Sequence, residues 1–183
     1  MKFQKVYIDT NVVRDCIKRR KDYSISLLKT VRQRKIECVT SIFTLLELWN
    51  LEKEEDFFFK KVRQGVELNA IVSSRRQKDL NDSELNEIND RLDKFFKEYD
   101  FIRQVQLMPE GWQFAFDIAR TTNIEPSDIL HLATALGEKC DLLITRDGPF
   151  IKEAKRFLRT NRYSLKVVKS EEAEKLIEQD TPR

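Results

Sequence analysis

The 183-residue chain has few of the residues that interrupt secondary structure or cross-link a secreted fold: four glycines, four prolines and three cysteines. Cys16, Cys38 and Cys140 are odd in number and widely spaced, which fits neither a disulfide framework nor a zinc site and suits a reducing cytoplasm. No apolar run approaches the roughly 18 residues that span a bilayer, and the N-terminus shows no signal-peptide pattern. We therefore expect a cytoplasmic protein with no membrane segment.

The small number of glycines also argues against a glycine-rich phosphate loop, so nucleoside-triphosphate hydrolysis is unsupported. Apolar residues make up 40% of the chain, which is enough for a core at this length. The sequence contains no repeat, low-complexity segment or linker rich in proline and glycine. We expect one domain over residues 1–179, followed by a polar tail at 180–183.

The net charge of +3 conceals a strong segregation of charge along the chain. Residues 14–35 carry nine basic groups against two acids, and residues 146–169 carry eight against two. Residues 79–100 instead hold eight acids and three bases. If the two basic stretches share a face, they form a surface that attracts phosphates; the alternative is two solvated helix faces with no ligand. The residues that we expect to bind nucleic acid are Arg19, Arg20, Arg146, Lys155 and Arg156.

Short β-like runs alternate with helical ones along the chain, which predicts an α/β fold with a parallel sheet covered on both faces. The expected strands are 5–9, 36–40, 102–107, 141–145 and 165–168. The expected helices are 24–34, 43–54, 56–73, 84–99, 112–121, 128–138, 149–159 and 171–178. No strand is expected between residues 43 and 100, so this stretch is predicted to be an inserted helical projection.

Four acidic residues are expected at one edge of this sheet. Ligands of an open parallel sheet bind at the carboxyl ends of its strands, where Asp9 and Asp147 end the first and fourth strands. Glu47 and Asp128 begin helices whose N-terminal turns reach the same edge. Asp141 is a poor candidate for this site, because it lies at the opposite end of the fourth strand, about 13 Å from Thr145.

Each acid also has a structural interpretation. Glu47 could complete a capping box with Thr44, Asp128 could complement its helix dipole, and Asp147 could be a turn residue. Asp9 is harder to explain structurally, because an acid at the end of a buried strand is costly without a partner. Four carboxylates in one cleft repel one another, so they either take up protons or recruit cations. An all-oxygen set of ligands selects Mg²⁺ or Mn²⁺, which can activate water for phosphodiester cleavage.

These residues resemble a PIN domain. The matching pieces are Tyr7-Ile-Asp9-Thr-Asn11, Thr44-Leu-Leu-Glu47-Leu48, Ser127-Asp128 through Leu136, and Leu142 through Phe150, in the family's order over about residues 5–152. The resemblance implies a three-layer α/β/α fold with a five-stranded parallel sheet of order 3-2-1-4-5. It also implies a metal-dependent endoribonuclease whose metal-binding and catalytic residues are Asp9, Glu47, Asp128 and Asp147, supported by Asn11 and Thr145.

Many PIN domains resemble VapC toxins, which are usually homodimers silenced by an antitoxin; the resemblance thus implies an RNA substrate, a possible antitoxin partner and a homodimer. The helical stretch 43–100 departs from that subgroup, so an RNA-processing nuclease without an antitoxin stays open. A catalytically silent PIN scaffold that binds RNA or protein is the alternative from another class. A receiver domain would need an aspartate ending the third strand, and a dehalogenase-type phosphatase would need an acid at Asn11.

The single histidine and the aromatic residues are expected to have structural roles. His131 lies one turn into the Asp128 helix among apolar residues, so we expect packing or a hydrogen bond rather than general-base catalysis. Trp49, Trp112 and Tyr7 could stack on bases, but core burial is favoured.

Overall fold

A computed structural model describes residues 3–75 and 79–180 of the chain. The predicted polar tail therefore lies outside the described residues from position 181 onward. The chain forms two compact units. The sheet unit comprises Met1–Thr44 and Asp100–Arg183, and the helical unit comprises Leu45–Tyr99. None of the described helices is both long enough and apolar enough to cross a membrane.

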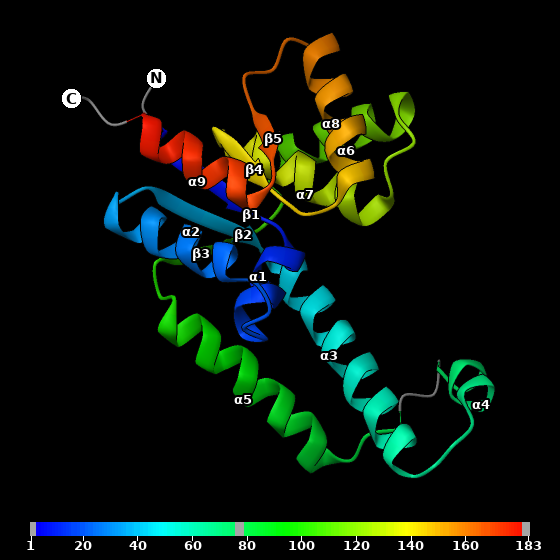
Figure 1. The fold of residues 1–183 in the computed structure, drawn as a ribbon. Coiled ribbons are helices and arrows are strands. Elements are labelled where there is room, and N and C mark those ends of the chain that lie inside the picture. Colours follow the sequence, from blue (N-terminus) through cyan, green and yellow to red (C-terminus); the bar gives the residue numbers. More distant parts are fainter. Residues whose placement is uncertain (1–2, 76–78, 181–183) are drawn as a thin grey trace. The chain divides into compact units, whose positions relative to one another are not determined.

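The sheet unit contains five parallel strands in the order β3-β2-β1-β4-β5 (Figure 1). The strands are β1 (Lys5–Ile8), β2 (Glu37–Ser41), β3 (Ile102–Val105), β4 (Leu142–Ile144) and β5 (Lys166–Val168). In the register of the central strands, Tyr7 pairs with Val39 on β2 and with Leu143 on β4. The five predicted strands and the predicted sheet order are confirmed, with shifts of at most two residues at the strand ends.

Six helices of the described chain flank the sheet: α1 (Thr10–Ile17), α2 (Asp22–Gln33), α6 (Pro109–Thr121), α7 (Pro126–Gly137), α8 (Gly148–Thr160) and α9 (Ser170–Gln179). Tyr7, Val39 and Leu143 face a core formed with α6, α7 and α8. On the other side of the sheet, α2 and α9 lie together, joined by a hydrogen bond of 2.5 Å from Ser26 to Glu174 (Figure 1). This arrangement is the predicted three-layer α/β/α fold.

Helix α1 was not among the predicted elements. Its first residue directly follows Asp9, which serves as its N-cap, so β1 passes into α1 without a loop. Val12 and Cys16 form the buried stripe of this helix at a spacing of four residues.

The helical unit holds most of α3 (Ile42–Arg63), together with α4 (Leu68–Ser73) and α5 (Asp82–Glu98). The prediction of separate helices at 43–54 and 56–73 is wrong: α3 runs unbroken through residue 55, and the break falls at Gly65, which has a φ of 72°. A capping box between Asn81 and Glu84 starts α5. Within this unit Arg91 on α5 forms ion pairs with Glu52 and Asp56 on α3.

The three cysteines are buried and form no disulfide with one another, as expected. Burial raises the pKa of the Cys140 thiol to about 12 and raises that of Cys38 further. The Cys38 and Cys140 thiols therefore stay protonated at neutral pH.

Candidate active site

Asp9 is the central residue of the site, at the point where β1 ends and α1 begins. It is only 4% exposed, yet both of its carboxylate oxygens accept hydrogen bonds. Oδ1 accepts from the backbone N–H of Thr10 at 2.5 Å, and Oδ2 accepts from Asn11 Nδ2 and Thr145 Oγ1, each at 2.6 Å. These donors, and the start of α1, compensate for the cost of burying the charge.

Asn11 and Thr145 are thus direct partners of Asp9. Asn11 Nδ2 also donates to Thr145 Oγ1 at 2.9 Å, and its Oδ1 accepts from the backbone N–H of Arg146 at 2.9 Å. The strands β1 and β4 are neighbours, so their carboxyl ends place these three side chains together. The network holds the Asp9 carboxylate in one orientation, which is what the outer partners of a metal ligand do.

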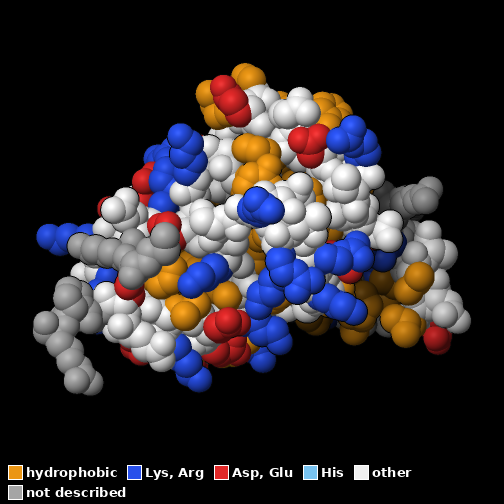
Figure 2. Space-filling view, turned by 90° about the horizontal axis from the view of Figure 1, so that it is seen from above, with side chains coloured by type: hydrophobic (Ala, Val, Ile, Leu, Met, Phe, Trp, Pro, Cys, Tyr) orange, Lys and Arg blue, Asp and Glu red, His pale blue; other side chains and the backbone are white. Residues whose placement is uncertain are grey.

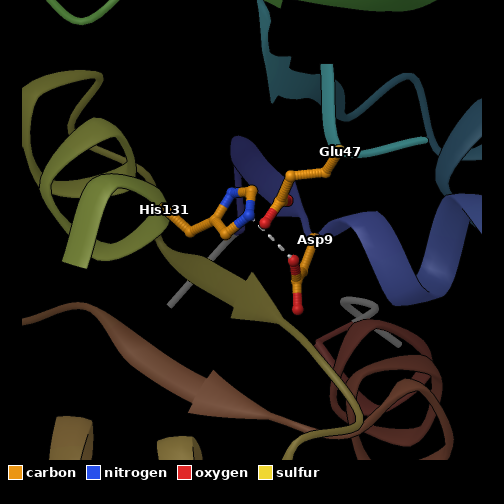
Figure 3. A group of neighbouring side chains, drawn as sticks. All are labelled: Asp9, Glu47 and His131. Atoms are coloured by element: carbon orange, nitrogen blue, oxygen red, sulfur yellow. Dashed lines mark ion pairs between the residues drawn. The ribbon is translucent and has the colours of Figure 1, made fainter. Parts of the chain in front are cut away.

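His131 on α7 lies against the same carboxylate. Its Nε2 is 3.3 Å from Asp9 Oδ1 (Figure 3). Its Nδ1 is 2.6 Å from the Tyr7 hydroxyl. Tyr7 and Asp9 are two residues apart along β1 and point to the same face of the sheet, so one imidazole reaches both. Because a carboxylate only accepts, Nε2–H pointing to Asp9 and Nδ1 accepting from Tyr7 satisfies both contacts with a neutral ring.

The expected packing or hydrogen bond of His131 is confirmed, but the sequence does not indicate that its partners are Tyr7 and Asp9. These contacts depend on how α7 packs against β1, which a single sequence does not reveal. The tilted ring of Phe43, 5.7 Å from the imidazole, packs on it as well.

Removing the Tyr7 hydroxyl is expected to destabilise the fold. Tyr7→Phe should lower the free energy of unfolding by about 1–2 kcal/mol, because the buried Nδ1 of His131 loses its donor. Urea unfolding followed by circular dichroism measures this change. Tyr163→Phe, at a partly buried tyrosine packed between Phe114 and Phe157, is the control. An equal loss in both variants would show that the hydrogen bond contributes nothing specific.

Asp147 lies next to this network. It is the N-cap of α8: its Oδ1 accepts from the backbone N–H of Phe150 at 2.7 Å, and its own N–H donates to Thr145 Oγ1 at 3.2 Å. The side chain is exposed, unlike that of Asp9. Asp147 is therefore a capping residue, and it also presents a carboxylate at the carboxyl end of β4.

Asp128 and Glu47 occupy early turns of their helices. Asp128 is half-buried in the first turn of α7, three residues before His131. Glu47 lies on α3, in the part of that helix that belongs to the helical unit. The capping-box interpretation of Glu47 with Thr44 does not fit, because Ser41 precedes the helix and its Oγ accepts from the Thr44 N–H at 3.0 Å.

Arg146 has an unexpected partner. Its Nε lies 3.0 Å from Oδ2 of Asp15, a residue of α1 with a side chain that is 2% exposed. Burial raises the pKa of Asp15, while the charge of Arg146 opposes that rise. Asp15 was not a candidate residue. Its position three residues after the buried Val12 would have placed it on the inner stripe of α1 if that helix had been predicted.

The other residues expected to bind nucleic acid, Arg19, Arg20, Lys155 and Arg156, are all exposed. Lysine and arginine side chains gather on the face shown in Figure 2. Core burial is confirmed for Tyr7 but wrong for Trp112, which is 49% exposed and lies beside the exposed Phe116 on the outer side of α6. Trp49, in the helical unit, is half-buried.

The PIN domain family matches residues 6–156, which is most of the chain. The chain belongs to this family. PIN domains are generally nucleases. The matched segment includes Asp9, Asp147 and the helices that carry the other two acids. Comparison with curated proteins gives no match.

Three solved structures share the PIN fold with this chain. VapBC2 from Rickettsia felis, bound to a DNA fragment from its promoter, is 13% identical with a TM-score of 0.55, covering 90% of this chain and 98% of that one. FitAcB from Neisseria gonorrhoeae is 16% identical with a TM-score of 0.54, covering 90% and 97%. VapBC-1 from nontypeable Haemophilus influenzae is 15% identical with a TM-score of 0.52, covering 90% and 98%.

Proposed function

We propose that this PIN domain is a Mg²⁺- or Mn²⁺-dependent endoribonuclease. The observation that carries the proposal is the Asp9 carboxylate, which is buried and oriented by Asn11 and Thr145, while the backbone N–H of Asp147 donates to the same Thr145 hydroxyl. A purely structural aspartate at a helix N-cap has no need of this second set of donors. A carboxylate fixed in this way is prepared to hold a cation at the carboxyl edge of the sheet.

The chemistry of the donors fits a hard divalent ion. The residues that would hold it are Asp9, Glu47, Asp128 and Asp147, all of which offer carboxylate oxygens. His131 could contribute a ring nitrogen only by giving up its contact with Asp9 or Tyr7. When bound, the ion would supply activation of water and neutralisation of charge on the phosphodiester. Asn11 and Thr145 would keep Asp9 in place.

We also propose that the substrate is RNA and that the protein acts as a toxin. Both proposals rest on PIN family membership and on the likeness of the fold to VapBC and FitAcB structures, which are toxin–antitoxin complexes. An antitoxin partner and a homodimer follow by the same analogy. A role in RNA processing without an antitoxin is the alternative that keeps the same chemistry.

Chelation of metal tests the nuclease proposal. Purified protein in excess EDTA should lose cleavage of a labelled single-stranded RNA, and adding Mn²⁺ or Mg²⁺ beyond the chelator should restore it. Gel electrophoresis with end-labelled RNA measures the rate and shows whether cuts are internal. A single-stranded DNA of the same sequence tests whether the enzyme prefers RNA to DNA. Cleavage at an equal rate in EDTA would contradict the metal requirement, and RNA binding without cleavage at any metal concentration would favour the silent scaffold.

A further inference from the structure

We propose that a hollow beside Asp147 is the subsite that holds the RNA strand next to the bond to be cleaved, binding its phosphates through Lys21, Arg146 and Lys169 and one base on Tyr23. This inference rests on the proposed function, because it assigns the hollow to the same substrate. It goes further by naming the residues that would hold the strand.

The hollow lies entirely in the sheet unit and has a volume of about 470 Å³, within the range of ligand pockets. Its three cations come from distant parts of the chain: Lys21 precedes α2, Arg146 follows β4, and Lys169 joins β5 to α9. Arg146 and Lys169 belong to one predicted basic stretch and Lys21 to the other. The fold thus brings the two stretches together here, next to Asn11 and Asp147.

Arg146 is fixed before any ligand arrives. Its Nε faces the buried Asp15, whose Oδ2 is also 3.4 Å from the Ser24 hydroxyl on α2. The guanidinium carries further N–H donors on its two Nη atoms, which suit a phosphate. A cation held in this way loses little side-chain entropy when an anion binds.

The backbone reinforces the positive character of the hollow. Helices α2 and α9 begin after Lys21 and Lys169, and neither of these N-cap side chains bonds to its helix. The positive ends of two helix dipoles therefore lie among the same cations. Glu171 also lines the hollow and opposes anion binding, whereas the charge of Asp147 is directed in part to the start of α8.

Tyr23 is the aromatic residue of this lining and is half-buried. Aromatic side chains next to a basic groove bind single strands by stacking on bases, with little dependence on sequence. Cations from separate elements around one aromatic ring therefore favour an unpaired strand over a duplex.

Binding of a fluorescein-labelled single-stranded RNA to Asp9→Asn protein, measured by anisotropy, tests the inference without cleavage. Adding Lys21→Ala and Lys169→Ala should weaken affinity about tenfold at low salt and reduce the slope of log Kd against log salt by about 1.4. Adding Tyr23→Ala should weaken affinity about tenfold, and Tyr23→Phe should preserve it. Lys94→Ala with Lys175→Ala removes the same charge from exposed helical positions outside this hollow and is the control.

Equal affinity and salt slope in the Lys21/Lys169 and Lys94/Lys175 proteins would overturn the subsite, as would equal losses in the two tyrosine variants. Failure of the proposed function can be distinguished from failure of the subsite. If the wild-type chain cleaves RNA but the hollow variants bind normally, only the subsite is wrong. If the hollow variants lose binding while the wild-type chain never cleaves RNA, the hollow binds RNA, but the nuclease proposal fails and with it the assignment of the hollow to a cleavage site.

Discussion

Replacing Asp9 with asparagine is expected to reduce metal-dependent RNA cleavage by at least about 100-fold. Changing the outer partners of a metal ligand commonly costs 10- to 100-fold, so losing the charge of the ligand itself should cost at least as much. Initial rates of cleavage at saturating Mn²⁺ measure the effect. Asp117→Asn, which neutralises a partly exposed acid on α6, should leave the rate unchanged.

The Asp9 variant also affects folding, because both oxygens of the carboxylate accept hydrogen bonds. The amide nitrogen of asparagine would face a donor on either side, Thr10 N–H or the pair Asn11 and Thr145. We expect a loss of about 1–3 kcal/mol in unfolding free energy. The rate must therefore be compared at a temperature where circular dichroism shows the variant to be folded.

Asp147→Asn removes the negative charge with less effect on folding than Asp9→Asn. The asparagine keeps an oxygen that can accept from Phe150 N–H, so the cap of α8 is preserved. The side chain is exposed, and little stability should be lost. We expect this protein to fold normally and to lose most of its cleavage. Full activity in folded protein of both the Asp9 and Asp147 variants would refute a role for these acids in catalysis.

The sequence predicted the sheet well because each strand is a short apolar run next to turn residues or helical periodicity. The sequence does not predict helix α1, because Asp9, its N-cap, is assigned to the end of the first strand and to metal binding. The predicted break at residue 55 is wrong, because the helix runs on to Arg63 and the left-handed backbone of Gly65 follows its end.

The site was predictable to the extent that strand ends determine it. Asp9 and Thr145 directly follow the neighbouring strands β1 and β4, and Asn11 lies in the first turn after Asp9, so their contacts follow from the parallel pairing of β1 with β4. The contacts of His131 with Tyr7 and Asp9 depend on the register of a helix over a sheet. The ion pair of Asp15 with Arg146 joins two residues that are 131 positions apart in the sequence. Periodicity indicates which face of an element is buried, but not which residue of another element it meets.

Arg146→Ala is expected to destabilise the fold more than removal of an ordinary surface charge. It leaves the buried Asp15 without its cation, and breaking a buried pair in this way costs about 3–5 kcal/mol. The Arg146 side chain is 37% exposed, so water screens the pair and we expect about 1–3 kcal/mol. Urea unfolding at pH 7 measures the loss, with Lys175→Ala as a control for removal of a surface charge.

The loss should depend on pH in a definite direction. Burial already raises the pKa of Asp15, so the folded chain binds this proton more tightly than the unfolded chain. The contribution of Asp15 to stability therefore falls as pH rises from the unfolded pKa of about 4 through the folded pKa. Without Arg146 the folded pKa rises further, so the deficit of the variant should be smallest near pH 4 and grow toward pH 7.

A second substitution identifies the group responsible. In the Arg146→Ala background, Asp15→Asn removes the buried charge and keeps a side chain of the same shape. The doubly substituted protein should regain stability at pH 7 and lose the added pH dependence, since no carboxyl remains to titrate at that position. A deficit of equal size at pH 4 and pH 7 in the Arg146 variant would instead assign the loss to packing of the arginine side chain.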